Sequence, residues 1–378
     1  MQFDLLHTDP ATQARAGSIH TDHGVIETPI FMPVGTAATV KGVHQRELRE
    51  DIKPDIILGN TYHLMLRPGA ERVAKLGGLH RFAGWSGPML TDSGGFQVWS
   101  LAQLRKMDAE GVTFQSHIDG SKHRLTPARS IEIQADLLGA DISMQLDECT
   151  DFPCSHDEAK RSLELSLDWG ARSIEAFGER ANQTLFGIIQ GSNYEDLREQ
   201  SARGVIAQGF GGYALGGLAV GEGHTQMCRT IDMTVPHLPE DRPRYVMGVG
   251  KPIDLVEAVA RGIDMFDCVL PTRSGRHGQA WTWDGPLNLK NARFNEDTSP
   301  LDETSDCAAS RDYSKAYLHH LFKAGEYLGP MLLSWHNTAF FQALMQKLRS
   351  AIADGTFADL RAELSSRWAS TASAPRGE

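Results

Sequence analysis

Three aspartates stand at or near the ends of short apolar runs. Asp92 follows P-M-L-T, Asp147 follows D-I-S-M-Q-L, and Asp267 lies inside D-M-F-D-C-V-L. Carboxylates crowded into one cleft acquire separated pKa values, which suits one as nucleophile and another as general acid or base. Asp267 is the strongest candidate, because an unused charge on an apolar strand would carry a large desolvation cost. For Asp92 a structural role stays open, since Asp before Ser-Gly-Gly is a natural turn and helix N-cap.

Other polar or glycine-rich segments follow the apolar runs. They are N-T-Y-H (60–63), D-S-G-G-F-Q (92–97), D-E-C-T (147–150), Q-G-S (190–192), G-G-L-A-V-G-E-G (216–223) and G-V-G-K (248–251). Glycines would let a planar ligand approach the main chain, with Glu222 near enough to orient the loop. Carboxylate, amide and backbone groups together could read a purine edge. Met247, Phe96 and Tyr245 could stack on such a ring, although these residue types on strands are more often core. A dinucleotide site is not supported, because G-x-G-x-x-G spacing is absent.

A basic patch follows Asp267 in a chain whose formal net charge is −11. Between residues 272 and 295 the patch has one acid, Asp284, against Arg273, Arg276, Lys290 and Arg293. Its place beside the candidate nucleophile favours phosphate binding, and a solvated basic loop is the alternative.

Eight apolar runs must position these residues. They are 30–34, 55–58, 88–91, 141–146, 184–189, 213–215, 244–247 and 264–270, and amphipathic helices are expected at 127–138, 157–178, 194–208 and 252–261. Strands alternating with helices predict an α/β fold with parallel strands, and eight repeats predict a closed (β/α)8 TIM barrel rather than an open doubly wound sheet.

The alternation of apolar runs with helical segments ends after the eighth run. Residues 271–310 are polar and turn-rich, and helical stretches follow near 312–323 and 328–353. We therefore divide the chain into a catalytic barrel (1–270), a loop and small subdomain inserted before the last barrel helix (271–337), the last barrel helix with a C-terminal helix (338–368), and a disordered tail (369–378).

Composition indicates a cytoplasmic protein. No apolar run approaches the ~20 residues that cross a bilayer, and the first residues lack the features of a signal peptide. Five scattered cysteines without a C-x-x-C pair fit a reducing compartment.

Six segments taken together resemble the motifs of bacterial tRNA-guanine transglycosylases. They are T-D-S-G-G-F-Q-V, D-E-C-T, I-I-Q-G-S, G-G-L-A-V-G-E, Y-V-M-G-V-G-K-P and D-M-F-D-C-V-L-P-T-R-S-G-R. The resemblance runs from about residue 3 to 355, and its last motif is highly specific. It implies exchange of the wobble guanine of tRNAs with G-U-N anticodons (Asp, Asn, His, Tyr) for 7-aminomethyl-7-deazaguanine in queuosine biosynthesis. No organic cofactor is expected.

The resemblance also implies roles for particular residues. Asp267 would be the nucleophile, forming a covalent ribosyl-enzyme, and Asp92 would transfer the proton. The substrate-binding set would be Asp92, Ser93, Gly94, Gly95, Phe96, Asp147, Gln190, Gly216, Gly217, Leu218, Tyr245 and Met247. The anticodon loop would contact Gly248, Val249, Gly250, Lys251, Pro252, Ile253, Asp254, Thr272, Arg273, Ser274, Gly275 and Arg276. Cys149 and Val220 resemble the pocket that favours the aminomethyl base over queuine.

One family feature is incomplete. The family carries C-x-C-x-x-C and a later histidine that bind structural zinc, and this chain has Ser305, Cys307, Ser310 and His336 at those positions. Hydroxyls are poor zinc ligands at neutral pH, so Cys307 and His336 form an incomplete site and stoichiometric zinc is not expected. Packing of Tyr317, Leu318, Leu332 and Trp335 would hold the subdomain instead.

The family implies a homodimer in which one subunit catalyses and the other helps to place the tRNA. Two alternative functions are a non-catalytic tRNA-binding subunit and a barrel nucleosidase or glycosidase. Retention of all three aspartates argues against the first, and exchange of labelled guanine into tRNA distinguishes all three.

Overall fold

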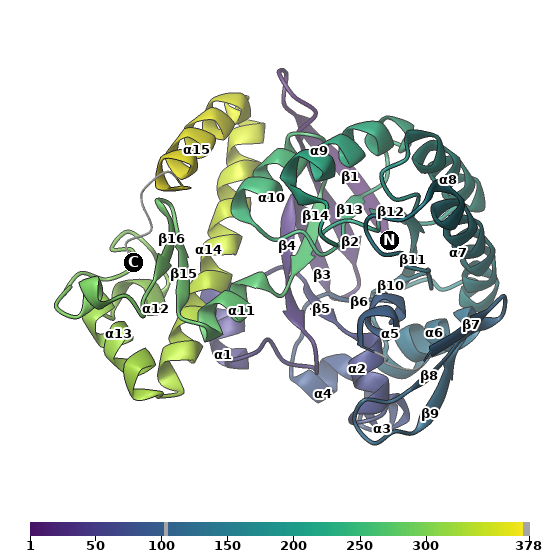
Figure 1. Cartoon of the computed structure of the whole chain (residues 1–378), viewed down its shortest axis with the longest axis horizontal. Coiled ribbons are helices and arrows are strands. Elements are labelled where there is room, and N and C mark those ends of the chain that lie inside the picture. The colour runs from purple at the N-terminus through teal and green to yellow at the C-terminus, as the bar shows by residue number, and fades with distance from the viewer. Residues whose placement is uncertain (102–104, 373–378) are drawn as a thin grey trace.

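The computed structural model, which describes residues 1–101 and 105–372, has a closed barrel of eight parallel strands at its centre (Figure 1). In order around the barrel these are β4 (Ile30–Gly35), β5 (Ile57–Gly59), β6 (Met89–Thr91), β10 (Ile142–Met144), β11 (Thr184–Ile189), β12 (Gly212–Leu215), β13 (Arg244–Val246) and β14 (Met265–Cys268), which pairs again with β4. Each strand falls on one of the eight apolar runs. The (β/α)8 fold is confirmed, and the open sheet is wrong.

Apolar residues on both faces explain why these runs become barrel strands. Inward side chains such as Met32, Ile188 and Met265 fill the barrel, while outward ones such as Phe31 and Ile189 pack under the surrounding helices. All six residues of β11 are buried. The barrel interior is thus a packed core, and only the strand ends can carry a site.

Helices cover the barrel as the periodicity predicts. They are α1 (Gln45–Glu47), η1 (Leu48–Ile52), α2 (Thr61–Leu66), α3 (Ala70–Lys75), α4 (Gly78–Ala83), α5 (Gly95–Leu101), α6 (Pro127–Ile131), η2 (Glu132–Leu138), α7 (His156–Phe177), α8 (Glu195–Gln208), α9 (Gly223–Thr234), η3 (Val235–His237) and α10 (Pro252–Val259). The four amphipathic helices expected from the sequence correspond to α6 with η2, α7, α8 and α10.

Two small antiparallel sheets were not anticipated. β1 (Gln2–Thr8), β2 (Arg15–Thr21) and β3 (Gly24–Thr28) form the first, and β7 (Arg105–Asp108), β8 (Gly111–Gln115) and β9 (Lys122–Leu125) form the second, after β6. Ile19 and Ile26 of the first sheet are fully buried in the cluster that fills the barrel. This sheet therefore closes the N-terminal end of the barrel, which we call the floor, and leaves the other end, the mouth, for chemistry.

The small subdomain follows β14, and in Figure 1 it lies beside the barrel across α14. It comprises α11 (Leu270–Arg276), β15 (Gln279–Thr282), β16 (Gly285–Asn288), η4 (Ala292–Phe294), α12 (Ala308–Arg311) and α13 (Lys315–Ala324). α14 (Leu328–Ala353) packs on α13 through Leu332 and Leu333 and on β4 through Phe341. The boundary expected at 337/338 therefore falls inside a single helix that both parts share.

The C-terminal helix α15 (Phe357–Ala372) is longer than expected. It includes the first four residues of the tail that the sequence predicted to be disordered, and that part of the prediction is wrong. Trp368 donates a hydrogen bond from Nε1 to the carbonyl of Trp283, which anchors the end of the helix. The rest of the tail, 373–378, lies outside the described residues. No helix in the described part of the chain is both long and apolar enough to cross a membrane.

Candidate active site

The three aspartates come from β6, β10 and β14 and stand at the mouth. Asp92 directly follows β6, Asp147 lies three residues beyond the end of β10, and Asp267 is the next-to-last residue of β14. The Asp267 carboxylate contributes to raising the pKa of Asp92, so the two groups share one electrostatic environment. None of the three forms an ion pair with a described Lys, Arg or His.

Asp267 is held by two neutral donors. Its Oδ1 accepts a hydrogen bond from the Tyr245 hydroxyl at 2.6 Å and one from the Gly248 backbone N–H at 2.9 Å. Burial raises the pKa of Asp267 above its ordinary value, and these two bonds oppose the rise. No hydrogen bond from the described residues 1–101 and 105–372 reaches Oδ2, so that oxygen can attack an electrophile while Oδ1 stays fixed.

Asp92 is more enclosed. The Asn60 amide donates to Oδ2, and the Thr61 backbone N–H donates to Oδ1 at 2.8 Å. Burial raises the pKa of Asp92 to about 6, with a smaller contribution from Asp267. A carboxyl group with this pKa can give and take a proton near neutral pH, as a general acid and base must.

Asp147 forms a polar group with Gln190 and Ser93. The Gln190 amide donates to Oδ2 at 2.7 Å, the Ser93 hydroxyl donates to Oδ1 at 3.3 Å, and the Cys149 thiol lies 3.8 Å from Oδ2. Burial raises the pKa of Asp147 to about 6. The arrangement offers a carboxylate and an amide side by side, which suits the polar edge of a base.

Glycines are required around this group because backbone and side chains approach closely. A Cβ at Gly95 would lie 2.7 Å from the Asp147 carbonyl oxygen, and one at Gly216 would lie 2.6 Å from Gln190 Nε2. Gly94 and Gly217 have φ of 85° and 66°, which favours glycine. The Glu222 carboxylate accepts from the Ala219 and Val220 amides at 2.6 and 2.9 Å, which confirms that it orients this loop.

The three candidate stacking residues differ in position. Phe96 is 43% exposed, and Met247 lies partly buried at the top of the barrel interior, so both remain available to a ligand. Tyr245 is 0% exposed and uses its hydroxyl on Asp267, so the prediction that it contacts a base is wrong. Leu218 is buried in the core, which leaves only its backbone for recognition.

Sequence reasoning missed the roles of residues that hold the carboxylates. Asn60 positions Asp92, and Tyr245 positions Asp267. The fully buried Arg198 side chain donates hydrogen bonds to the carbonyls of Ile189 and Ser192, which lie on either side of Gln190 in the chain. The segment N-T-Y-H (60–63) is predictable as a polar segment after a strand, but no sequence pattern indicates which carboxylate it contacts.

The two expected RNA-contacting segments flank Asp267 in space. Gly248–Asp254 runs from the Asp267-binding amide into α10, with Lys251 exposed before the helix and the Asp254 carboxylate bound to His224 at 2.6 Å. Val249 is buried, and Gly250 has no room for a Cβ because Cys268 Cβ would lie 2.5 Å away. The backbone and Lys251, rather than every side chain, can therefore reach a ligand. Pro252 is also buried at the start of α10, and Ile253 is partly buried.

Residues 272–276 lie in the helix α11. Thr272, Ser274 and Gly275 are buried, and a Cβ at Gly275 would lie 2.6 Å from the Ser334 nitrogen of α14. These three residues pack the helix against α14, and contact between the segment 272–276 and RNA stays a prediction. Arg273 is exposed, and Arg276 Nη1 is buried without a hydrogen-bond partner in the part of the chain that the structure describes. Burial and the neighbouring Arg273 lower the pKa of Arg276.

The four positions that correspond to the family's zinc ligands are Ser305, Cys307, Ser310 and His336, and two of these side chains, Ser310 and His336, are hydrogen-bonded to each other. His336 Nε2 donates to the Trp281 carbonyl at 2.8 Å, so its Nδ1 accepts from the Ser310 hydroxyl at 2.8 Å. Burial lowers the pKa of His336 to about 4 and raises that of the Cys307 thiol to about 11. Two of the four positions carry serine hydroxyls, which are poor zinc ligands at neutral pH, so this donor set does not fit structural zinc.

Packing around this group follows the sequence prediction in part. Leu318 and Leu332 are buried in one cluster with Cys307, and Trp335 packs against it. Trp335 also donates from Nε1 to the Asp51 carboxylate at 2.6 Å, which ties the subdomain to η1. Tyr317 is 40% exposed, so its predicted part in the core is wrong.

Comparison with known proteins gives one consistent match. Residues 9–370 fit the family model described as queuine tRNA-ribosyltransferase. The queuine tRNA-ribosyltransferase of Caulobacter vibrioides is 64% identical over 365 residues, which are 97% of this chain and 98% of that protein. Those of Zymomonas mobilis and Brucella suis are 59% and 58% identical, over 94% and 97% of this chain and 93% and 96% of theirs.

Proposed function

The chain belongs to the queuine tRNA-ribosyltransferase family, and we propose that it exchanges the wobble guanine of G-U-N anticodon tRNAs for 7-aminomethyl-7-deazaguanine. It is a pentosyltransferase of queuosine biosynthesis. The observation that carries the mechanism is the geometry of the mouth, where Asp267 and Asp92 are both fixed by neutral donors and neither is neutralised by a cation.

In the first displacement, the free Oδ2 of Asp267 attacks C1′ of the ribose as the N-glycosidic bond breaks. The bonding electron pair passes to the departing guanine, which takes a proton from Asp92. Tyr245 and Gly248 keep the carboxylate oriented and ionised by donating to Oδ1. A covalent ribosyl-enzyme results, as in retaining glycoside hydrolysis.

In the second displacement, Asp92 takes a proton from the incoming base, whose nitrogen attacks C1′ and releases the Asp267 carboxylate. A pKa of about 6 for Asp92 fits both directions of transfer, because neither protonation state is strongly disfavoured near neutral pH. Both steps occur at one carbon, so the configuration there is retained.

The base-binding part of the proposal involves Asp147, Gln190 and the glycine loops. The carboxylate and amide offer acceptors and a donor to a guanine-like edge, and Phe96 and Met247 supply apolar surface for its faces. We propose that Cys149, which lies beside Asp147, and Val220 border the space for the substituent at position 7. We propose that this space takes an aminomethyl group.

Arg273 and Arg276 carry the proposed contact with the anticodon backbone. Arg276 Nη1 is buried without a partner in the described structure, beside the exposed Arg273 on α11. A phosphate there would satisfy that nitrogen and relieve the repulsion between the two guanidinium groups. A loop base can be unstacked and presented to the mouth at modest cost.

We further propose a cytoplasmic homodimer, with catalysis independent of zinc. The subdomain offers exposed aromatic surface at Tyr317 and Tyr327 for a partner copy. No step of the exchange requires a metal-activated group. Sedimentation analysis of the purified protein measures the oligomeric state, and a monomer at working concentration would contradict this part.

Exchange of labelled guanine into tRNA tests the function. Purified protein should incorporate label into a tRNA with a G-U-N anticodon and not into one whose wobble base is not guanine. A non-catalytic tRNA-binding subunit would retain the tRNA without incorporation, and a nucleosidase would release base from free nucleosides. Either of those outcomes would replace the proposal.

A further inference from the structure

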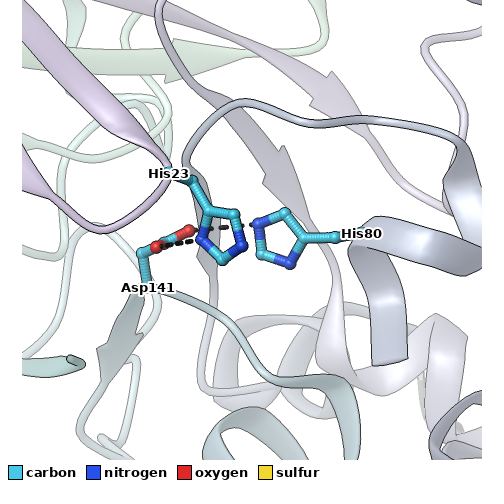
Figure 2. A group of neighbouring side chains, drawn as sticks. All are labelled: His23, His80 and Asp141. Carbon is cyan, nitrogen blue, oxygen red and sulfur yellow. Dashed lines mark hydrogen bonds and ion pairs between the residues drawn. The ribbon is translucent and has the colours of Figure 1, made fainter. Parts of the chain in front are cut away.

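A second group of ionisable side chains lies at the floor of the barrel. Figure 2 shows His23, His80 and Asp141 with the two imidazole rings stacked and the carboxylate facing both. His23 Nδ1 is 2.6 Å from one carboxylate oxygen, and His80 Nε2 is 3.2 Å from the other. The ring centroids are 3.8 Å apart. Within the described residues, this is the one group of three or more such side chains close enough to share a metal ion.

The three residues belong to separate parts of the fold. His23 is in the turn between β2 and β3, His80 is on α4, and Asp141 immediately precedes β10. The active-site Asp147 follows the same strand, so β10 separates this group from the mouth. Anything that binds all three side chains would join the sheet of the floor to the barrel and to α4.

The carboxylate is already oriented for a ligand. Asp141 is 2% exposed, and its Oδ2 accepts a hydrogen bond from the Met89 backbone N–H at 2.8 Å. A backbone bond of this kind fixes a metal-binding carboxylate in the way that outer hydrogen bonds do at known sites.

We propose that His23, His80 and Asp141 bind a divalent transition cation of the zinc class at the floor, as a structural link. Two imidazoles and one carboxylate are ligands that Zn²⁺ accepts, and Mg²⁺ prefers oxygen alone. On binding, each neutral imidazole carries its proton on its other ring nitrogen, so that the nitrogen now facing the carboxylate gives its lone pair to the cation. Water completes the coordination, since His23 is 40% exposed.

Binding requires only a local movement. Ligand atoms around tetrahedral zinc lie ~3.3 Å apart, so the His23–Asp141 distance must open by several tenths of an ångström. In-plane lone pairs of two stacked rings do not meet at one point, so one ring must tilt. His23 is the one free to move, because it lies on an exposed turn, whereas His80 is only 15% exposed.

Zinc titration of chelator-treated full-length protein tests the site, with His23→Ala as the variant and His20→Ala as the matched control. His20 is an exposed histidine on the same hairpin, 3.2 Å from Asp4, and is not part of the group. Wild type and His20→Ala should bind one zinc per chain and melt at higher temperature with zinc than with magnesium. His23→Ala should bind zinc at least about tenfold more weakly and lose the thermal effect.

The same variants separate this site from the Cys307 and His336 positions. Cobalt bound here should show no sulfur-to-metal charge-transfer band, whereas cobalt on Cys307 should show one. Guanine exchange should be the same in wild type, His23→Ala and His20→Ala. Equal zinc affinity in wild type and His23→Ala, a sulfur band, or absence of saturable zinc binding would each overturn the proposal.

Discussion

The two ends of the barrel use buried carboxylates in opposite ways. At the floor, Asp264 accepts from Arg15 Nε at 2.9 Å and Nη2 at 2.5 Å, and both side chains are almost fully buried. At the mouth, Asp267 is only three residues further along the chain, and it accepts from a tyrosine hydroxyl and a backbone amide.

Burial raises the pKa of both aspartates. At the floor a guanidinium opposes that rise and keeps the charge paired, which fixes the chain but leaves the carboxylate unreactive. At the mouth neutral donors orient the carboxylate without neutralising it, so its charge remains available for attack. The charge of the hydrogen-bond donor, more than burial, therefore distinguishes a structural carboxylate from a reactive one.

Replacing the reactive carboxylate should have the largest effect. In Asp267→Asn the side chain keeps its size and can still accept from Tyr245 and Gly248, but it cannot attack C1′. We expect guanine exchange to fall by at least about 10⁴-fold, as for the loss of other catalytic nucleophiles. Labelled-guanine incorporation measures it, and tRNA retention on a filter should stay close to wild type. Exchange within tenfold of wild type would remove Asp267 from the nucleophile's role.

Asp92→Asn should have the next largest effect. The amide cannot transfer the proton that departing guanine requires, and positioned general acids and bases contribute about 10²–10⁴-fold. Single-turnover guanine release measures the loss, with Asp136→Asn, an exposed partner of Arg180, as the control. Unchanged release would return Asp92 to the purely structural role of a turn residue.

Tyr245→Phe tests whether a neutral donor tunes Asp267. Removing the hydroxyl takes away a bond that lowers the pKa of Asp267, so that pKa rises and the acid limb of the rate profile moves to higher pH. Hydrogen bonds to charged groups contribute about 1.5–3 kcal/mol, so exchange should fall about tenfold or more at acidic pH. Recovery is expected as pH rises and the carboxylate ionises again.

Tyr213→Phe is the matched control, because Tyr213 is buried on the neighbouring strand β12 in the outer core, away from Asp267. Its acid limb should coincide with that of wild type. An equal displacement of both profiles would show that the effect arises from general loosening of the barrel.

Asp264→Asn examines the structural side of the comparison. It leaves the Arg15 charge buried without its partner, which should lower the free energy of unfolding by about 3–5 kcal/mol. Exchange per folded molecule should not change. Glu132→Gln removes an exposed partner of Arg129 and should cost no more than about 1 kcal/mol in the same urea titration. Similar losses in both variants would contradict a special role for the floor pair.

Ser310→Ala should have the smallest effect on exchange, namely none. It leaves the buried Nδ1 of His336 without its donor, which costs about 1–3 kcal/mol of stability. Thermal unfolding measures it against Ser350→Ala, at an exposed position of α14. If Ser310→Ala lost exchange activity at a temperature where it remains folded, the subdomain would have to act directly at the mouth.

The barrel was predictable from the sequence because each strand is an apolar run followed by a polar turn. The β1–β3 sheet was not, since β1 is mostly exposed and its pairing with β2 uses residues of mixed polarity. α15 continued past Trp368 because a tertiary hydrogen bond to Trp283 stabilises a stretch whose composition suggested disorder.

The candidate site was predictable in its aspartates but not in their partners. Asp267 could be singled out by its charge within an apolar strand, whereas Tyr245 looked like a stacking residue because its hydroxyl direction depends on the neighbouring strand. His23, His80 and Asp141 are separated by 57 and 61 residues, and no spacing pattern connects them. The two serines at the zinc positions did reveal the incomplete site, but the bond between Ser310 and His336 emerged only from the fold.

Trapping the covalent intermediate tests the central claim most directly. Wild-type protein is incubated with a G-U-N anticodon tRNA without added base, quenched in denaturant, and digested with protease and nuclease for mass spectrometry. We predict a ribose-linked adduct on the peptide that contains Asp267, with release of one guanine per adduct, and no adduct in Asp267→Asn. An adduct on another residue, or rapid exchange by wild type with no adduct under any quench, would contradict the account.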